Sequence, residues 1–197
     1  YNQFMVSTHR DKARVGTITS RIEHFLEWKD PYPLKKTDLG DSSTSQDVLI
    51  AGMFEKTNFL DLIQNFTVFE PMDGRTIKKI ARYQQLRAVH KSIERIKSGT
   101  DRKSKSGVIW HTQGSGKSLT MVFLTLKIRR DPELRDYKMV FITDRTQLDT
   151  QLTATFQNTQ SETIHHANSV KELKELLQTD SSDIITAMVQ KFQESAD

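Results

Sequence analysis

The sequence predicts an α/β fold in which helices cover both faces of a parallel sheet. Two observations support this fold class. Short apolar runs that suit buried strands occupy residues 108–110, 139–142 and 184–189, and residues 163–166 are a further strand candidate. Segments with the apolar spacing of helices separate these runs. Strands that alternate with helices in this way are typical of βαβ units and of a parallel sheet.

One glycine-rich stretch, Gly107–Ser118, has the order of elements that a phosphate-binding loop requires. Val108–Trp110 predicts a buried strand before the loop, and Ser118–Ile128 has helical spacing after it. A polyphosphate carries several negative charges, and backbone N–H groups at a helix N-terminus are preset donors for them. Gly114 and Gly116 let the backbone approach the phosphates closely.

The loop supplies most of the candidate site residues. Lys117 is predicted to reach the β- and γ-phosphates, and the Ser118 hydroxyl to take one place on the bridging Mg²⁺, so these two are the candidate catalytic residues. The other predicted nucleotide contacts in the loop are Thr112, Gln113, Gly114, Ser115 and Gly116. His111 stands where the usual pattern has Gly, a substitution that some helicase-like motors tolerate. The alternative interpretation is a flexible basic turn.

Composition limits the classes of protein to which the chain can belong. Of its 197 residues, 36% are hydrophobic and 27% charged, which is enough apolar material for one core and a small appendage. The sequence has no apolar run of about eighteen residues and no charged-then-apolar leader, so we expect no membrane contact and a cytoplasmic location. With zero cysteines, disulfides and thiolate metal sites are excluded. The net charge of +4 favours a nucleic-acid partner.

Residues 1–45 predict the tail of a preceding domain, followed by a linker. The alternating run at 1–8, a polar turn at 10–16 and a return at 17–19 predict a hairpin. The polar stretch 35–45 predicts an exposed connection that ends at a domain boundary. Because the chain opens inside a strand-like run without an initiator Met, we expect an interior fragment of a longer protein.

Glu27-Trp28-Lys29 has the Glu-x-Lys spacing of metal-dependent nucleases, and Asp11 lies upstream as a possible second ligand. Such a site needs Glu and Lys on one face of a strand. Ser20, with Glu23 three residues later, instead indicates a capped helix that places Glu27 and Lys29 on the helix or at its end. A solvated helix face is therefore favoured over a nuclease centre.

Residues 46–106 predict a mainly helical lead-in to the loop. The expected elements are helices at 46–54 and 58–65, a strand at 66–69, a turn at 71–74, one long helix at 76–97 and a flexible basic loop at 98–106. Beyond the loop, residues 107–197 predict the parallel sheet, with helices at 148–156 and, after a capping box at Ser169 and Glu172, at 173–177. His165 and His166 are adjacent on a predicted strand and face opposite ways, which favours structural histidines over a metal site.

Four stretches of the chain match segments of one known family: 2–29, Asn65–Phe69, Ala81–Val89 and His111–Ser118. Together they resemble the motor, or restriction (R), subunit of type I restriction-modification enzymes, a superfamily 2 helicase-like ATPase. In that family they correspond to the segment after the nuclease core, the pre-motor linker, an adenine-recognition motif and a phosphate loop with His in its first position.

The resemblance implies that 107–197 is the first part of a RecA-like motor lobe that binds ATP and Mg²⁺. It implies nucleotide contacts by Arg82 and Gln85. The chemistry of Gln85 agrees, because an amide can donate to N7 of adenine while it accepts from the exocyclic amine. The alternative interpretation of Gln85 is a solvated helix residue.

Two weaker matches imply DNA contacts. Thr143-Asp144-Arg145 is similar to the first DNA-contact motif of superfamily 2 helicases, and Gln190-Lys191-Phe192 resembles a later one. The implied DNA-binding residues are Asp144, Arg145 and Gln190. Ala187-Met188 stand where the family usually has Thr, which is a departure from its pattern.

The implied partners are double-stranded DNA and the methyltransferase and specificity subunits of the restriction complex. By the same resemblance, the nuclease carboxylates are expected before Tyr1 and an Asp-Glu motif after Asp197, so residues 1–197 alone are expected to have negligible ATPase activity. Two alternatives stay open. They are a superfamily 2 helicase without a restriction role and a P-loop regulatory module that never touches DNA.

Overall fold

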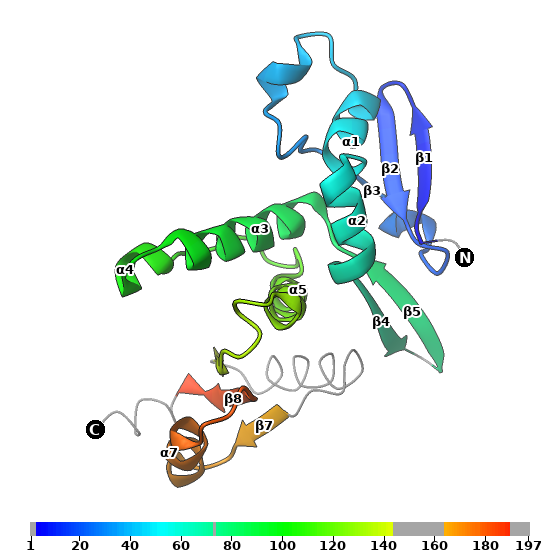
Figure 1. The fold of residues 1–197 in the computed structure, drawn as a ribbon. Coiled ribbons are helices and arrows are strands. Elements are labelled where there is room, and N and C mark those ends of the chain that lie inside the picture. Colours follow the sequence, from blue (N-terminus) through cyan, green and yellow to red (C-terminus); the bar gives the residue numbers. More distant parts are fainter. Residues whose placement is uncertain (1–2, 73, 144–163, 190–197) are drawn as a thin grey trace. The chain divides into compact units, whose positions relative to one another are not determined.

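A computed structural model of the chain describes residues 3–72, 74–143 and 164–189 (Figure 1). Its contacts group the chain into two compact units, Tyr1–Phe123 and Leu124–Asp197. The domain boundaries predicted near residues 45 and 106 stay predictions.

The first unit begins with a small antiparallel sheet in the order β1-β2-β3, made of β1 (Met5–His9), β2 (Lys12–Gly16) and β3 (Leu26–Glu27). The expected hairpin is present, but its second strand covers 12–16 and not 17–19. The turn is short because Arg10 adopts a φ of 27°, in the left-handed region. Ala13 and Val15, two positions apart on β2, are both buried, as one face of a strand requires.

The helix predicted from Ser20 is wrong. A 3₁₀ turn, η1 (Ile22–His24), leads directly into β3, which pairs with β2 through Arg14 and Glu27. Local hydrogen bonding explains the difference, because the Ser20 hydroxyl accepts from the backbone N–H of Thr17 at 2.9 Å. Ser20 therefore closes a turn toward the N-terminus and does not cap a helix that follows it.

A helical layer follows, and here the predictions of two helices are confirmed. It contains η2 (Lys36–Leu39), α1 (Ser45–Met53) and α2 (Lys56–Asn65). Thr44 caps α1 through a reciprocal pair, since its backbone N–H donates to the Asp47 carboxylate at 2.8 Å and its hydroxyl accepts from the Asp47 N–H at 3.3 Å. A side chain at Gly52 would collide with the Asp30 carbonyl, so α1 lies against the 28–31 segment as closely as glycine permits.

The single long helix predicted over 76–97 is wrong in its first part. β4 (Thr67–Met72) and β5 (Arg75–Ile80) form an antiparallel hairpin that pairs Thr67 with Ile80 and Met72 with Arg75. The β-branched residues of 75–80 meet a partner strand there, and this pairing overrides the helical spacing. The helix α3 (Tyr83–Ser98) begins only after the extended residue Arg82.

A short helix, α4 (Arg102–Lys105), lies within the expected basic loop, and the Asp101 carboxylate caps it by accepting from the Ser104 N–H at 2.8 Å. The core of the first unit is formed by buried residues of α1, α2, β4, α3 and α5 (Lys117–Arg130), together with Phe66 between α2 and β4. They include Leu49, Met53, Leu62, Phe66, Val68, Leu86, Val89 and Phe123.

The second unit holds a three-stranded parallel sheet in the order β6-β8-β7. Its strands are β6 (Met139–Thr143), β7 (Ile164–Ala167) and β8 (Ile184–Met188), which confirms three of the four predicted strands. The helix α7 (Val170–Gln178) confirms the predicted capped helix, with the Ser169 hydroxyl accepting from the Glu172 N–H at 3.1 Å. Its buried Leu173 packs in one cluster with Ala167, Ile185 and Ala187.

The strand predicted at Val108–Trp110 is not formed in the structure. This segment has no ladder hydrogen bonds, and Val108 and Trp110 are 91% and 88% exposed. A buried parallel strand needs a neighbouring strand. None of the described strands pairs with residues 108–110. An apolar run alone therefore did not determine a strand here.

The helix that follows the loop, α5 (Lys117–Arg130), confirms the helix expected at 118–128. The helix predicted at 148–156 lies outside the described residues. Among the residues that are described, no helix combines the length and the apolarity needed to cross a bilayer.

Candidate nucleotide-binding site

The predicted phosphate loop is a tight turn that leads into α5. Gly114 and Gly116 have φ values of +74° and +83°, which side chains rarely adopt. Ser115 closes the turn, because its N–H and its hydroxyl both donate to the Thr112 carbonyl, at 3.3 and 2.6 Å. Apart from Gly114 and its two chain neighbours, no described residue has an atom within 4 Å of the Cβ position at Gly114, so that face of the loop is open.

Lys117 is the first residue of α5, and its ammonium turns back onto the loop. Nζ donates to the carbonyls of His111 and Thr112, at 3.1 and 3.0 Å. The side chain is exposed, so the ammonium is held by two acceptors at the loop surface. A phosphate oxygen is a stronger, charged acceptor for such an ammonium than a neutral carbonyl.

Ser118 lies in the first turn of α5 and is half-buried. Within the described part of the chain its hydroxyl has no hydrogen-bond partner. The N–H groups of a first helical turn also have no partners inside the helix. An exposed ammonium, a hydroxyl without a partner and an open loop face are the donor set that a magnesium-bound polyphosphate requires. The residues present therefore fit ATP and Mg²⁺.

Gln85 reaches the loop from the first turn of α3. Its Nε2 donates to the Gly116 carbonyl at 3.0 Å, and its Oε1 accepts from the Arg82 N–H at 2.8 Å. The residue is 2% exposed, so the alternative interpretation of a solvated helix residue is wrong. Arg82 itself is exposed at the N-terminus of the helix. The structure thus brings Gln85 into direct contact with the phosphate loop.

The Gly116 carbonyl has further donors, which the sequence did not reveal. The backbone N–H and the hydroxyl of Thr120 donate to it at 3.0 and 3.1 Å, one helical turn into α5. Thr120 is buried and holds the loop to its own helix, independently of Gln85. Its position four residues after Gly116 was the available signal, since such residues are neighbours on a helix.

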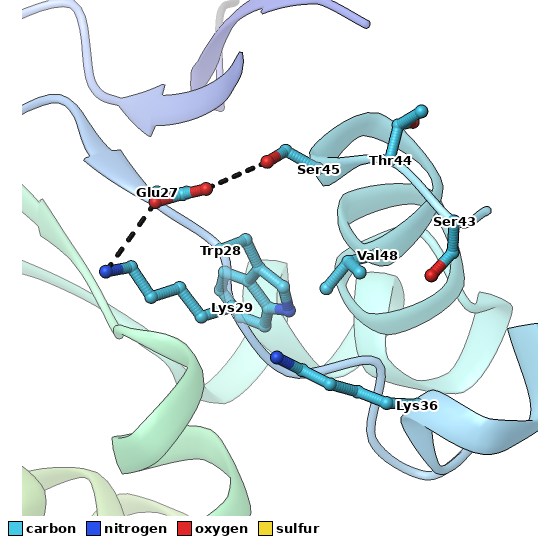
Figure 2. Close-up of a pocket in the computed structure, with 8 residues that line it drawn as sticks. All are labelled: Glu27, Trp28, Lys29, Lys36, Ser43, Thr44, Ser45 and Val48. Carbon is cyan, nitrogen blue, oxygen red and sulfur yellow. Dashed lines mark hydrogen bonds and ion pairs between the residues drawn. The ribbon is translucent and has the colours of Figure 1, made fainter. Parts of the chain in front are cut away.

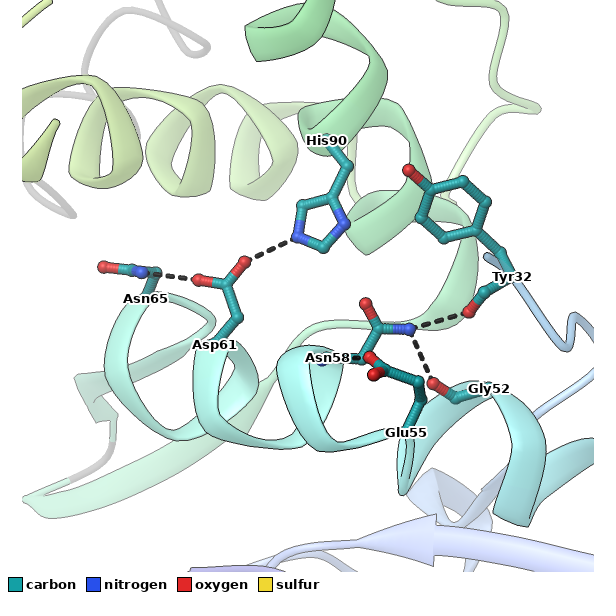
Figure 3. A network of polar contacts seen from close by, with 7 residues as sticks. All are labelled: Tyr32, Gly52, Glu55, Asn58, Asp61, Asn65 and His90. Carbon is teal, nitrogen blue, oxygen red and sulfur yellow. Dashed lines mark hydrogen bonds and ion pairs between the residues drawn. The ribbon is translucent and has the colours of Figure 1, made fainter. Parts of the chain in front are cut away.

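A polar network ties α2 to the segments around it (Figure 3). The side-chain amide of Asn58 donates to the carbonyls of Tyr32 and Gly52, both at 2.7 Å, and its backbone N–H donates to the Glu55 carboxylate at 2.8 Å. Burial alone would raise the pKa of Glu55, but the N–H groups of Asn58 and Thr57 stabilise the charged form and leave the pKa lowered.

The Glu27-x-Lys29 segment lines a pocket of about 350 Å³ (Figure 2). The expectation that Glu27 lies on a helix or at its end is wrong, because Glu27 belongs to the strand β3. Glu27 nevertheless has its own partners, since Ser45 Oγ donates to one carboxylate oxygen at 2.9 Å and Lys29 Nζ lies 3.6 Å from the other. In the described residues no group of three His, Cys, Asp or Glu could hold a metal ion. That this segment is not a nuclease centre stays a prediction.

The residues predicted to contact DNA, Asp144, Arg145 and Gln190, lie outside the described residues. The two adjacent histidines of β7 have separate neighbours. His165 Nε2 lies 3.3 Å from an Asp183 carboxylate oxygen, and His166 Nδ1 lies 3.1 Å from the Thr186 hydroxyl.

Known proteins that resemble this chain point to one family. Residues 84–197, which include Gln85 and the loop, match the family model described as SWI2/SNF2 ATPase. The type I restriction enzyme HindI endonuclease subunit of Haemophilus influenzae is 33% identical over 98% of this chain and 19% of its own length. The putative type I restriction enzyme MjaIXP endonuclease subunit of Methanocaldococcus jannaschii is 33% identical over 98% of this chain and 20% of its own length. The chain thus spans about one fifth of these relatives.

Proposed function

This chain belongs to the SWI2/SNF2 ATPase family, and from that premise we propose that it is part of the ATP-driven, DNA-translocating restriction subunit of a type I restriction endonuclease. The observation that carries the proposal is the loop. Two glycines with left-handed φ values, the exposed ammonium of Lys117 and the Ser118 hydroxyl, which has no hydrogen-bond partner among the described residues, lie together at the loop and the start of α5.

Each loop residue has a defined task in this proposal. Gly114 and Gly116 shape the turn, and the loop N–H groups other than that of Ser115, which donates to the Thr112 carbonyl, face the phosphate oxygens. Lys117 exchanges its two carbonyl acceptors for oxygens of the β- and γ-phosphates. Ser118 would hold Mg²⁺ through its hydroxyl, and a bound Mg²⁺ supplies charge neutralisation at the transferring phosphoryl group.

Gln85 is proposed to select adenine. A side-chain amide has two N–H donors and two acceptor lone pairs. Gly116 and Arg82 use one of each, so one donor and one acceptor are left for N7 and the exocyclic amine of adenine. Since Gln85 is 2% exposed, a neighbouring side chain has to move before a base can reach the amide. Arg82 is proposed to contact the nucleotide from the start of the same helix.

The larger assembly is also a proposal. We infer a RecA-like lobe around the parallel sheet β6-β8-β7, with DNA contacts by Asp144, Arg145 and Gln190. The implied partners are double-stranded DNA and the methyltransferase and specificity subunits. The names of the relatives, which are type I restriction endonuclease subunits, support this assignment.

ATP hydrolysis by the full-length protein, with and without duplex DNA, tests the function. A DNA-translocating motor should hydrolyse ATP faster when duplex is added, and this stimulation should weaken as salt rises, because phosphate contacts release counterions. Hydrolysis that is indifferent to DNA at every salt concentration would instead favour the P-loop regulatory module. DNA-stimulated hydrolysis without DNA cleavage by the assembled complex would favour a helicase that has no restriction role.

A further inference from the structure

Asp61 on α2 and His90 on α3, the helix that also carries Gln85, form a nearly buried polar pair. Nε2 of His90, on α3, lies 2.6 Å from Oδ2 of Asp61, on α2 (Figure 3). The other carboxylate oxygen accepts from the side-chain amide of Asn65. The His90 and Asp61 side chains are only 13% and 10% exposed, so water competes little with the contact between them.

His90 also contacts two aromatic rings. Its ring centroid lies 5.8 Å from that of Tyr32 and 5.6 Å from that of Phe66. A side chain held both by its ring faces and edges and by a short hydrogen bond has little freedom to shift. The middle of α3 is therefore fixed against α2 at His90.

Phe66 connects this pair to the second helix of the site. Its ring lies 5.4 Å from the ring of Phe123, on α5, and neither residue is exposed. Its carbonyl accepts from the N–H of Ala81, two residues before α3 begins, at 2.9 Å. One buried ring thus contacts α3 through His90 and α5 through Phe123, the two helices that carry Gln85 and Lys117.

The contact between Gln85 and the loop tolerates little movement. The 3.0 Å separation from Nε2 to the Gly116 carbonyl is so close that a Cβ at Gly116 would lie 2.7 Å from Nε2. Donor and acceptor of an N–H···O hydrogen bond lie about 2.7–3.2 Å apart, and at about 3.6 Å a side-chain contact is no longer a hydrogen bond. A displacement of α3 by roughly 1 Å would therefore break this contact.

We propose that Asp61 and His90 are positioning residues for nucleotide selection, which set the place of Gln85 by fixing α3 against α2 and, through Phe66, against α5. The proposal rests on the proposed role of Gln85 in adenine recognition. Neither residue touches the nucleotide, and both act only through the position of the Gln85 amide.

His90→Phe is the decisive variant. Phenylalanine keeps an aromatic ring beside Tyr32 and Phe66 but removes the contact between His90 Nε2 and Oδ2 of Asp61. The ratio of ATP to GTP affinity should fall by about as much as in Gln85→Ala, roughly tenfold for the loss of one bidentate base contact. Affinity for magnesium tripolyphosphate, which has no base, should stay unchanged because Thr120 still holds the Gly116 carbonyl.

The experiment measures the binding of ATP, GTP and tripolyphosphate to the full-length protein and to Gln85→Ala, His90→Phe and the double variant. An affinity ratio does not depend on the folded fraction, so a partial loss of stability does not imitate the effect. Ser92→Ala is the matched control, because the hydrogen bond of the Ser92 hydroxyl in the described part of the chain is to the Ala88 carbonyl within α3 itself. Asp61→Asn is the milder second variant. Asparagine keeps the side-chain volume but offers one oxygen to the donors of His90 and Asn65. The ratio of ATP to GTP affinity should therefore fall by a smaller factor than in His90→Phe.

The outcomes distinguish the positioning role of Asp61 and His90 from the adenine recognition by Gln85 on which it rests. A ratio that falls equally in Gln85→Ala, His90→Phe and the double variant, with Ser92→Ala unchanged, supports positioning through Gln85. A fall in Gln85→Ala alone overturns the positioning role and leaves adenine recognition by Gln85 intact. An unchanged ratio in Gln85→Ala overturns adenine recognition itself, and the positioning role with it.

Discussion

The Nε2 of Gln85 donates to the carbonyl of Gly116, 31 positions later in the chain, at 3.0 Å. This hydrogen bond joins the first turn of α3 to the glycine at which the phosphate loop enters α5. It also explains why the loop has no side chain at that position.

Gly116→Ala should damage the site in two ways. A side chain at a φ of +83° costs about 1–2 kcal/mol, and its Cβ would also push against Gln85 Nε2. Gly114→Ala is the matched control, since its φ is +74° but no described residue beyond its chain neighbours has an atom within 4 Å of its Cβ position. We expect Gly116→Ala to lose more unfolding free energy in denaturant titrations than Gly114→Ala. When Gln85→Ala is added to Gly116→Ala, the extra loss of unfolding free energy relative to Gly114→Ala should disappear. Equal losses in the two single glycine variants would contradict this account.

Lys117→Ala should abolish ATP-dependent translocation in the full-length protein and leave the fold intact. In the proposed function the ammonium contributes charge at the transferring phosphoryl group and little packing, because the side chain is exposed and its hydrogen bonds to described residues are with two loop carbonyls. Strand displacement ahead of the motor measures translocation, and thermal melting checks the fold. Lys103→Ala, on the exposed surface of α4, removes the same charge and should translocate normally. Near-normal translocation by Lys117→Ala would refute the assignment of the loop.

Lys138→Met should destabilise the second unit. The Lys138 ammonium donates to the carbonyls of Leu176, at 2.6 Å, of Leu177, at 3.1 Å, and of Thr179, all near the C-terminus of α7. A cation at a helix C-terminus contributes roughly 0.3–1 kcal/mol when solvent screens it. Unfolding in denaturant measures the loss. Lys174→Met makes the same change of charge on the exposed side of α7 and should leave stability unaltered, so matching losses would contradict the capping role.

Acid stability should depend on Glu55. Folding lowers its pKa, because hydrogen bonds to the carboxylate outweigh burial. A lowered carboxylate pKa stabilises the fold above the unfolded value, about 4.3, and this contribution is lost as the pH falls through the folded value. Glu55→Gln should therefore reduce stability at pH 7 and flatten its decline in acid, measured by denaturant unfolding at a series of pH values. The exposed Glu23→Gln is the control, and equal curves for Glu55→Gln and the native chain would refute the claim.

Sequence patterns predicted those elements whose signal is local. The parallel strands β6 and β8 follow from apolar runs, and α7 follows from its cap at Ser169. β5 was missed because a hairpin partner, and not its own spacing, decides its conformation. The run at 108–110 was predicted as a strand from apolarity, but a strand also requires a neighbour to pair with.

In the candidate site, too, the residues with a local sequence signal could be located from the sequence, whereas contacts between helices could not. The glycine pattern and the helix after it locate Lys117 and Ser118, because the chemistry of phosphate binding demands that spacing. The pair Asp61 and His90 is 29 positions apart, and no spacing rule links two residues on different helices. Their contact depends on how α2 and α3 pack, which only the folded chain determines.

The two carbonyls that hold the Lys117 ammonium also bear on how fast a spent nucleotide leaves. When a phosphate departs from a loop lysine, the charged group loses its partner, and this loss raises the barrier to departure. Here the carbonyls of His111 and Thr112 lie 3.1 and 3.0 Å from Nζ, so under the proposed function they would replace the phosphate oxygens as these leave. The loop would then have a lower affinity for the spent nucleotide and release it faster, which suits the proposed role in a motor.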